Sequence, residues 1–319
     1  MKLVIQIPCY NEEECLPVVL KSLPEKIEGI DEIEVLIIDD GSTDKTVDIA
    51  KNLGVKNFVY LSPNKGLAKA FAHGLEKALE LGADIIINID ADNQYNSSDI
   101  EKLIKPILND NADIVIGTRP VEKIKHFSLI KKLLQKTGSA VMRLISSTSI
   151  KDAPSGFRAF SRNAAMQLNV FDNYTYTLET IIQAQAKGLV LTSVPIRVNP
   201  ELRKSRLVKN IFDYIRHSVF TMLRMFIVYR PFRFFITIAA LSIFFGLFIG
   251  ARFLWFYFSG SGNGHMQSLI LAAILLLAGI QVALIAVLSE LISINRKLIE
   301  DVQRRLKLLD LKNKKEVVK

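Results

Sequence analysis

Cysteine, tryptophan and histidine are scarce in this chain of 319 residues, which contains two, one and four of them respectively. The two cysteines, Cys9 and Cys15, lie close together near the start, and no histidine-rich segment accompanies them to complete a zinc site. We therefore expect free thiols in a reducing compartment. The opening run MKLVIQIP is too short for the apolar region of a signal peptide, and we expect the N-terminus to remain in the cytosol.

Acidic residues are outnumbered by basic ones, 32 against 41, which gives a formal net charge of +9. The basic residues gather before, between and after strongly apolar segments, a placement that anionic lipid head groups explain better than nucleic acid does. Half of the residues are apolar. Together with the length, this composition indicates a soluble domain joined to a membrane portion, with the lipid bilayer as a partner and no nucleic acid.

Two long apolar segments, residues 234–258 and 268–289, are each about the 20 residues needed to cross a bilayer. Arg252 lies among aromatic residues at the end of the first segment, where its side chain is expected to reach the interface. Basic residues precede and follow the pair, among them Arg230, Arg233, Arg296 and Lys297. The sequence predicts an integral membrane protein with a hairpin of two transmembrane helices and both termini cytosolic; the alternative is two buried core helices.

Amphipathic patterns flank these apolar segments. Residues 206–230 and residues 127–145 both mix apolar positions at helical spacing with lysine and arginine, so each either lies at the membrane interface or packs on the soluble core. Residues 291–319 form a charged helical tail with a leucine-rich stripe. The stripe is a short contact between copies of the chain, which would make a homo-oligomer, or simply one face of an amphipathic helix.

Residues 1–120 alternate short apolar runs with amphipathic stretches, and the runs are LVIQI, EVLIID, NFVYL, DIIINID and DIVIGT. That rhythm is typical of an α/β domain with a largely parallel sheet. Ser98 followed by Glu101 has the spacing of a helix capping box, while Gly54 and Gly82 stand where helices should end. Ligands of such sheets bind at the carboxyl ends of the strands.

Three polar clusters follow predicted strands. PCYNEEE, residues 8–14, opens a helix whose first amides can face a ligand, unless Asn11 simply caps that helix. DDGSTD, residues 39–44, offers an acidic pair to ribose hydroxyls or a base N–H, and Ser42 or Thr43 is expected to cap the next helix; the alternative is a solvated turn.

The third cluster is DADNQ, residues 90–94. Asp90, Asp92 and Gln94 present oxygen ligands suited to a hard divalent cation, Mg²⁺ or Mn²⁺, which would bridge to substrate phosphates. Asp-x-Asp is a common pattern by itself, but here it follows a buried strand and stands in register with the other two clusters.

Taken together, these motifs resemble the GT-A fold of inverting family 2 glycosyltransferases, and within it the dolichyl-phosphate mannosyltransferase and polyprenyl-phosphate hexosyltransferase branch. The resemblance covers residues 1–230 and, more loosely, the hairpin. Besides the three clusters it rests on NKGLAKA, GTR, SGFRAF and ETIIQAQAKG. It implies a fold of the α/β class, a GT-A nucleotide-diphospho-sugar transferase domain with amphipathic interfacial helices and a C-terminal transmembrane hairpin.

The resemblance also implies roles for single residues. Nucleoside-binding residues would be Pro8, Tyr10, Glu12 and Asp39, with Lys65 close by, and the metal on the diphosphate would be held by Asp90, Asp92 and Gln94. Catalysis would then rest on Asp92 and on two phosphate-handling arginines, Arg119 and Arg203. Arg203 belongs to the basic run RKSRL, for which a lipid-facing charge run is the alternative.

One position departs from the family pattern. Some relatives place an aspartate directly before the Phe-Arg pair where this chain has Gly156, so no base is expected there. A lipid monophosphate, with a second pKa of about 6, needs little deprotonation. The expected reaction is inverting transfer of a hexose from a nucleotide-sugar, of the GDP-mannose or UDP-glucose type, to a polyprenyl or dolichyl phosphate at the cytosolic face.

Other readings remain. A processive polysaccharide synthase would carry a Gln-x-x-Arg-Trp motif, which is absent, since the single tryptophan is Trp255 in an apolar segment. A diacylglycerol acceptor would need a true general base, and a non-catalytic membrane scaffold would need no metal ligands. The expected organisation is a cytosolic catalytic domain over residues 1–205, a juxtamembrane helix over 206–230, the hairpin over 231–290 and the tail over 291–319.

Overall fold

The computed structural model describes residues 1–120, 150–170, 176–200 and 226–317 except 261, together with 216, 219, 220, 223 and 224. The chain divides into two compact units, Met1–Met222 with Arg304–Lys319 and Leu223–Gln303. The predicted helix at residues 127–145, the basic run with Arg203 and most of residues 206–230 lie outside the described residues.

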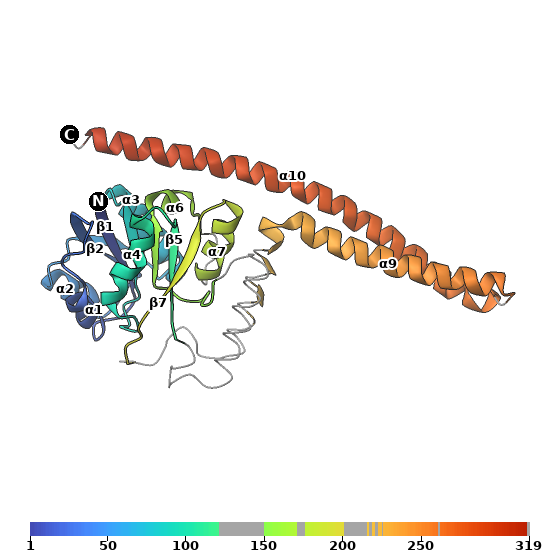
Figure 1. Cartoon of the computed structure of the whole chain (residues 1–319), viewed down its shortest axis with the longest axis horizontal. Helices are drawn as coiled ribbons and strands as arrows, with labels where there is room; N and C mark the ends of the chain where they lie inside the picture. Colours follow the sequence, from blue (N-terminus) through green and yellow to red (C-terminus); the bar gives the residue numbers. More distant parts are fainter. Residues whose placement is uncertain are drawn as a thin grey trace. The chain divides into compact units, whose positions relative to one another are not determined.

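The first unit is built on a seven-stranded sheet with the order β3-β2-β1-β4-β6-β5-β7 (Figure 1). Its strands are β1 Lys2–Cys9, β2 Glu32–Asp39, β3 Asn57–Tyr60, β4 Ile85–Asn88, β5 Ile114–Thr118, β6 Arg158–Ser161 and β7 Leu191–Pro195. The five predicted strands are confirmed. The sheet is largely parallel, as predicted, except at β6, which pairs antiparallel with both β4 and β5.

Helices cover both faces of this sheet because its central strands have buried side chains on both faces. Leu3, Ile5 and Ile7 of β1 pack with α1 (Leu16–Ser22) and with α4 (Ile100–Leu108). α3 (Leu67–Glu80) lies on the opposite face. The remaining short helices are α2 Thr46–Asn52, η1 Ser97–Asp99, α6 Arg162–Gln167 and α7 Thr177–Ala186.

Helix ends follow the sequence signals in part. Gly54 and Gly82 have positive φ just beyond the ends of α2 and α3, as predicted. The predicted capping box at Ser98 is wrong, because Asn96 is the cap and accepts a hydrogen bond from the Ser98 amide. An asparagine side chain competes well for this role, and it shifts the start of the helical turn by two residues.

The second unit contains α9 (Pro231–Phe258), η3 (Gly262–His265) and the first part of α10 (Met266–Val317). α9 and α10 lie side by side in Figure 1, and small residues make this close approach possible. A methyl group placed on Gly279 would lie 2.5 Å from Ile243 and one on Gly246 would lie 3.0 Å from Leu276. α10 is one continuous helix of 52 residues, so no break separates the predicted second span from the predicted tail.

Both helices are long and apolar enough to cross a membrane. Only 11% of the most apolar window of α9 and 17% of that of α10 is buried. A core helix of a soluble protein would be mostly buried, so the alternative of two buried core helices does not fit these exposed fractions. The leucine-rich stripe of α10 is exposed at Leu291 and Leu298, and a contact between copies of the chain stays a prediction.

Candidate active site

The sheet topology brings the predicted site segments to one edge. β1 pairs in parallel with β2 and with β4. β4 and β5 both pair antiparallel with β6, so they run in the same direction as each other. The polar clusters therefore follow strands that end at the same side of the sheet. Because β6 runs in the opposite direction, it begins at that edge, and the segment that leads into it, residues 150–157, lies there too.

The first two clusters interlock through their backbone. The amide of Asn11 donates to Ser42 Oγ at 2.9 Å, and Asn11 Oδ1 accepts from the Thr43 amide at 2.8 Å. The amide of Glu12 donates to Thr46 Oγ1 at 2.7 Å. Asn11 adopts a φ of 55°, a left-handed conformation that asparagine tolerates better than most residues. The two loops thus form one rigid wall.

Two helix caps that the sequence offered as alternatives do not form in this wall. The residue before α1 is Cys15, not Asn11, because the asparagine side chain is bonded to Thr43 instead. The first helical amide of α2, that of Thr46, donates to Asp44 Oδ1 at 3.0 Å, so neither Ser42 nor Thr43 serves that end. Asn11 and Ser42 thus hold the two loops to each other, while Asp44 also binds the start of its own helix.

The predicted nucleoside-binding residues lie in or beside this wall. Pro8 and Asp39 are buried at the ends of β1 and β2, and Asp39 Oδ1 accepts from the Ser42 amide at 3.2 Å. Glu12 is 8% exposed and Tyr10 is 44% exposed. Glu12 lines a hollow of about 250 Å³ together with other residues of the two loops, Asn11, Glu13, Glu14, Cys15, Thr43 and Asp44.

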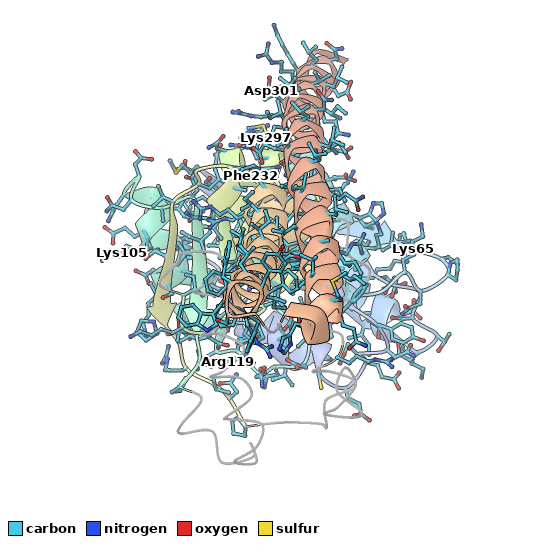
Figure 2. The ribbon with its side chains drawn as sticks, turned by 90° about the vertical axis from the view of Figure 1, so that its right-hand side faces the viewer. Lys65, Lys105, Arg119, Phe232, Lys297 and Asp301 are labelled. Carbon is cyan, nitrogen blue, oxygen red and sulfur yellow. The ribbon has the colours of Figure 1, made fainter. Side chains whose placement is uncertain are left out.

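Asp40 organises the segment that carries Lys65. Its carboxylate accepts from the amides of Lys65 and Gly66 at 2.7 and 2.8 Å. Of the acidic pair, only Asp39 was predicted as a nucleoside-binding residue, although the adjacent Asp40 makes these contacts. The Lys65 side chain is exposed, and Figure 2 shows it away from Arg119. The structure therefore does not bring these two predicted residues together.

The DADNQ loop follows β4 and is held in a tight turn. Asp92 Oδ1 accepts from the Gln94 amide at 3.0 Å, and Asn93 between them has a φ of 58°. Loss of hydration and the negative charge of Asp92 raise the pKa of Asp90 to about 7, against the opposing charges of Arg119 and Arg158. Glu12 also contributes to this shift, so the wall of the first two loops and the DADNQ loop lie within electrostatic reach of each other.

A buried polar layer supports Asp90 from behind. Asn88 Nδ2 donates to the Gly156 carbonyl at 2.9 Å and to the Tyr176 hydroxyl at 2.8 Å. The Gly156 amide donates to the Tyr95 hydroxyl at 3.0 Å. A Cβ on Gly156 would lie 2.7 Å from Asp90 Oδ2 and 3.1 Å from the Tyr176 hydroxyl. Only glycine fits here while Asp90 keeps its place.

Arg119 is tied to a partner that the sequence analysis missed. Its Nε and Nη2 donate to the two carboxylate oxygens of Asp152 at 2.8 and 3.0 Å, and its backbone amide donates to the same group at 3.1 Å. Burial works against the charge, but Asp152 raises the pKa of Arg119 above its ordinary value. Nη1 contacts Gln94 Oε1 at 3.3 Å. Arg119 therefore joins the loops after β4 and β5 to the segment before β6.

The donor set at the DADNQ loop suits a divalent cation that shares its coordination with a substrate. Among the described residues, no three Asp, Glu, His or Cys side chains form a metal-binding group by themselves. Mg²⁺ commonly takes one or two carboxylates and completes its shell with phosphate oxygens and water. Asp90 and Asp92 would supply the carboxylates, and the Gln94 oxygen keeps a second lone pair beside its contact with Arg119.

The family model described as "Glycosyl transferase family 2" matches residues 4–168. A UDP-N-acetylglucosamine–dolichyl-phosphate N-acetylglucosaminyltransferase from Methanococcus voltae is 32% identical over 212 residues, which are 60% of this chain and 83% of that protein. A dolichol-phosphate mannosyltransferase from Pyrococcus furiosus is 29% identical over 266 residues, or 81% of this chain and 72% of that protein.

Among solved structures, a glucosyl-3-phosphoglycerate synthase from Mycobacterium tuberculosis, in complex with Mn²⁺, uridine diphosphate and phosphoglyceric acid, superposes with a TM-score of 0.56 at 17% identity. The superposition covers 70% of this chain and 78% of that one. At this identity the likeness concerns the fold, and the predicted GT-A fold is confirmed.

Ionisation of Asp90 should lower the free energy of unfolding when no cation is bound. An unfolded aspartate has a pKa of about 3.9, below the value of about 7 in the folded chain, so the folded state binds the proton more tightly. Stability from this group therefore falls as the pH rises from about 4 to about 7 and then levels off. Asp90→Asn should raise the Tm in EDTA increasingly over that interval, as measured by thermal unfolding in detergent. An equal Tm change at all pH values would contradict this origin.

Proposed function

Because this chain belongs to glycosyl transferase family 2 and is a glycosyltransferase, we propose that it transfers a hexose from a nucleotide-sugar to a polyprenyl or dolichyl phosphate at the cytosolic face of a membrane. The relatives named above act, by their names, on dolichyl phosphate and use different sugars. The proposed donor is of the GDP-mannose or UDP-glucose type. The observation that carries the proposal is that one chain combines the strand-end site with two exposed membrane-length helices.

On the donor side, we assign the nucleoside to the wall formed by residues 8–14 and 39–44. Pro8 would support the base or ribose, while Glu12 and Asp39 would accept hydrogen bonds from its N–H and O–H groups. Asp90, Asp92 and Gln94 would hold a divalent cation, Mg²⁺ or Mn²⁺, against the diphosphate. When bound, this ion supplies Lewis-acid stabilisation of the leaving group.

On the acceptor side, an oxygen of the lipid phosphate would attack C1 of the sugar. The bond from C1 to the diphosphate oxygen breaks, and the nucleoside diphosphate leaves with the electron pair, so the anomeric configuration inverts. The acceptor has a second pKa of about 6 and is largely dianionic at neutral pH. Arg119, charged and held by Asp152 beside Gln94, would orient the two anionic partners. Arg203 is proposed for the same task from its sequence alone.

The packing around Gly156 supports an acceptor that needs no base from this position. A carboxylate side chain here would have to begin with a Cβ 2.7 Å from Asp90 Oδ2. An aspartate as found in some relatives would therefore displace the proposed metal ligand. A neutral hydroxyl acceptor such as diacylglycerol needs a general base, whereas a phosphate dianion does not.

Transfer should require a divalent cation. With labelled UDP- and GDP-sugars, a short polyprenyl phosphate and Mn²⁺, the purified protein should form one lipid-linked product with inverted configuration, and EDTA should abolish the reaction. Asp92→Ala should lower turnover by at least about 100-fold while the protein stays folded, since the carboxylate is not part of the core. Asp48→Asn, on the exposed face of α2, is the matched control and should retain full activity.

Full activity of the protein in EDTA, or of the Asp92→Ala variant, would refute the metal assignment. Label found on diacylglycerol or on a growing polymer, or a retained anomer, would refute the proposed acceptor and reaction. The lipid extract therefore separates the two parts of the proposal.

The proposed hairpin should place the turn after α9 on the far side of the membrane. Both native thiols are buried, Cys9 at 2% and Cys15 at 1% exposure, so they give little background with an impermeant maleimide. In sealed cells Ser259→Cys should react, and Ser98→Cys in the exposed part of the catalytic domain should react only after lysis. The reverse pattern would mean the opposite orientation, and protection of both would mean that the turn does not emerge.

A further inference from the structure

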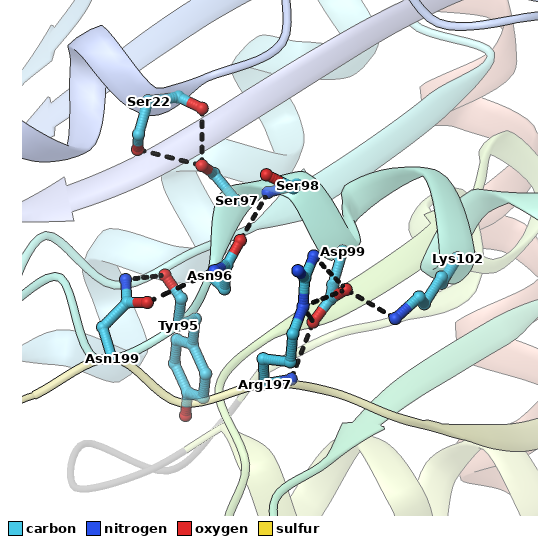
Figure 3. A network of polar contacts seen from close by, with 9 residues as sticks. All are labelled: Ser22, Tyr95, Asn96, Ser97, Ser98, Asp99, Lys102, Arg197 and Asn199. Atoms are coloured by element: carbon cyan, nitrogen blue, oxygen red, sulfur yellow. Dashed lines mark hydrogen bonds and ion pairs between the residues drawn. The ribbon is translucent and has the colours of Figure 1, made fainter.

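The chain that leaves β7 runs along the residues that directly follow the DADNQ loop, and Figure 3 shows Arg197 and Asn199 beside Tyr95, Asn96 and Asp99. Tyr95 and Val198 form an antiparallel bridge, and the Asn96 amide donates to the Arg197 carbonyl at 3.4 Å. This contact joins parts of the sequence that are about a hundred residues apart. It arises because β7 is parallel to β5, so both strands deliver their following residues to the site edge of the sheet.

Asn199 makes most of the contacts with this loop. Its amide donates to the Gln94 carbonyl at 2.9 Å, and its Nδ2 donates to the Tyr95 carbonyl at 3.2 Å and to Asn93 Oδ1 at 3.3 Å. Its Oδ1 accepts from Asn96 Nδ2 at 3.4 Å. One side chain therefore contacts three of the four residues that follow Asp92.

One of the residues that the Asn199 side chain contacts, Asn93, has an unusual backbone conformation. Asn93 has a φ of 58° and stands between Asp92 and Gln94. A left-handed conformation at a non-glycine residue persists only where surrounding contacts fix it. The turn that it makes allows the Gln94 amide to reach Asp92 Oδ1 at 3.0 Å. The side chain of Asn199 thus acts on the orientation of both oxygen donors.

We infer that Asn199 is a positioning residue for the cation that the DADNQ loop holds on the donor diphosphate. This inference rests on the proposed function, since it assumes the role given there to Asp92 and Gln94. Residues that orient metal ligands by hydrogen bonds change metal affinity when they are replaced, because the ligands then lose their common geometry. Asn199 does so from the segment after β7 through its contacts with residues 93–96.

The neighbouring residue on the same segment has a different task and provides a control. Arg197 donates from Nη2 and Nε to Asp99 at 2.9 and 3.1 Å, and its backbone amide donates to the same carboxylate at 2.7 Å. Lys102 of α4 forms a second ion pair with Asp99, at 2.8 Å. Asp99 starts the helix and lies beyond the DADNQ loop, so Arg197 anchors the segment without ordering the ligands.

The test is a titration of the full-length protein with Mn²⁺ in the presence of UDP or GDP, in which binding is read directly from the electron paramagnetic resonance signal of free Mn²⁺, together with the Mn²⁺ dependence of sugar transfer. Asn199→Ala removes both side-chain donations, while Asn199→Asp keeps the shape but cannot donate to Tyr95 or Asn93. Both should raise the Mn²⁺ concentration at half-saturation by about tenfold, with a much smaller change in kcat at saturating Mn²⁺. Arg197→Gln should leave that concentration unchanged, although its Tm should fall.

Unchanged half-saturation in both Asn199 variants would overturn the inference while leaving the proposed function intact. The inference would also be wrong if the Arg197→Gln variant showed the same rise, since a general loosening of the segment would then explain it. If the unsubstituted protein transferred sugar equally well without Mn²⁺ or any other divalent ion, the metal assignment and this inference would fail together.

Discussion

A completely buried guanidinium fixes the segment on which the rest of the site depends. Arg158 donates from Nε to the Ser155 carbonyl at 2.8 Å and from its Nη atoms to the carbonyls of Thr177 and Ala153 at 2.8 and 2.6 Å, and Nη1 also donates to Thr180 Oγ1 at 2.7 Å. Burial lowers its pKa to about 10, so it remains charged at neutral pH. The guanidinium therefore holds the segment before β6 against the start of α7.

From that fixed segment two opposite requirements follow. Gly156 must lack a side chain so that Asp90 can occupy the space in front of it, and Asp152 must carry one so that Arg119 has a fixed direction. Burial in this space, and then the charge of Asp92, raise the pKa of Asp90 to about 7. A site of this kind is poised for a cation that arrives with a phosphate ligand, and its stability in the absence of the cation is reduced accordingly.

Sequence reasoning found the parts of the site that are local in the chain. The clusters at residues 8–14, 39–44 and 90–94 were recognisable because each follows an apolar run, and parallel strands end at a common edge. Asp152 and Asn199 were missed because their importance depends on pairings across 33 and about a hundred residues, which no local pattern encodes. β6 was missed for a similar reason: its four residues are a strand only because β4 and β5 enclose them.

A crystal structure of the catalytic unit in the full-length chain, soaked with Mn²⁺ and the nucleoside diphosphate of its donor, tests the central claim most directly. Anomalous scattering locates Mn²⁺ without assumptions about its ligands. The account predicts one peak between the carboxylates of Asp90 and Asp92 and the diphosphate, with the nucleoside along the wall formed by Pro8, Glu12 and Asp39. A nucleotide bound elsewhere, or an ordered nucleotide on this wall with Mn²⁺ absent from the DADNQ loop at saturating concentration, would contradict it.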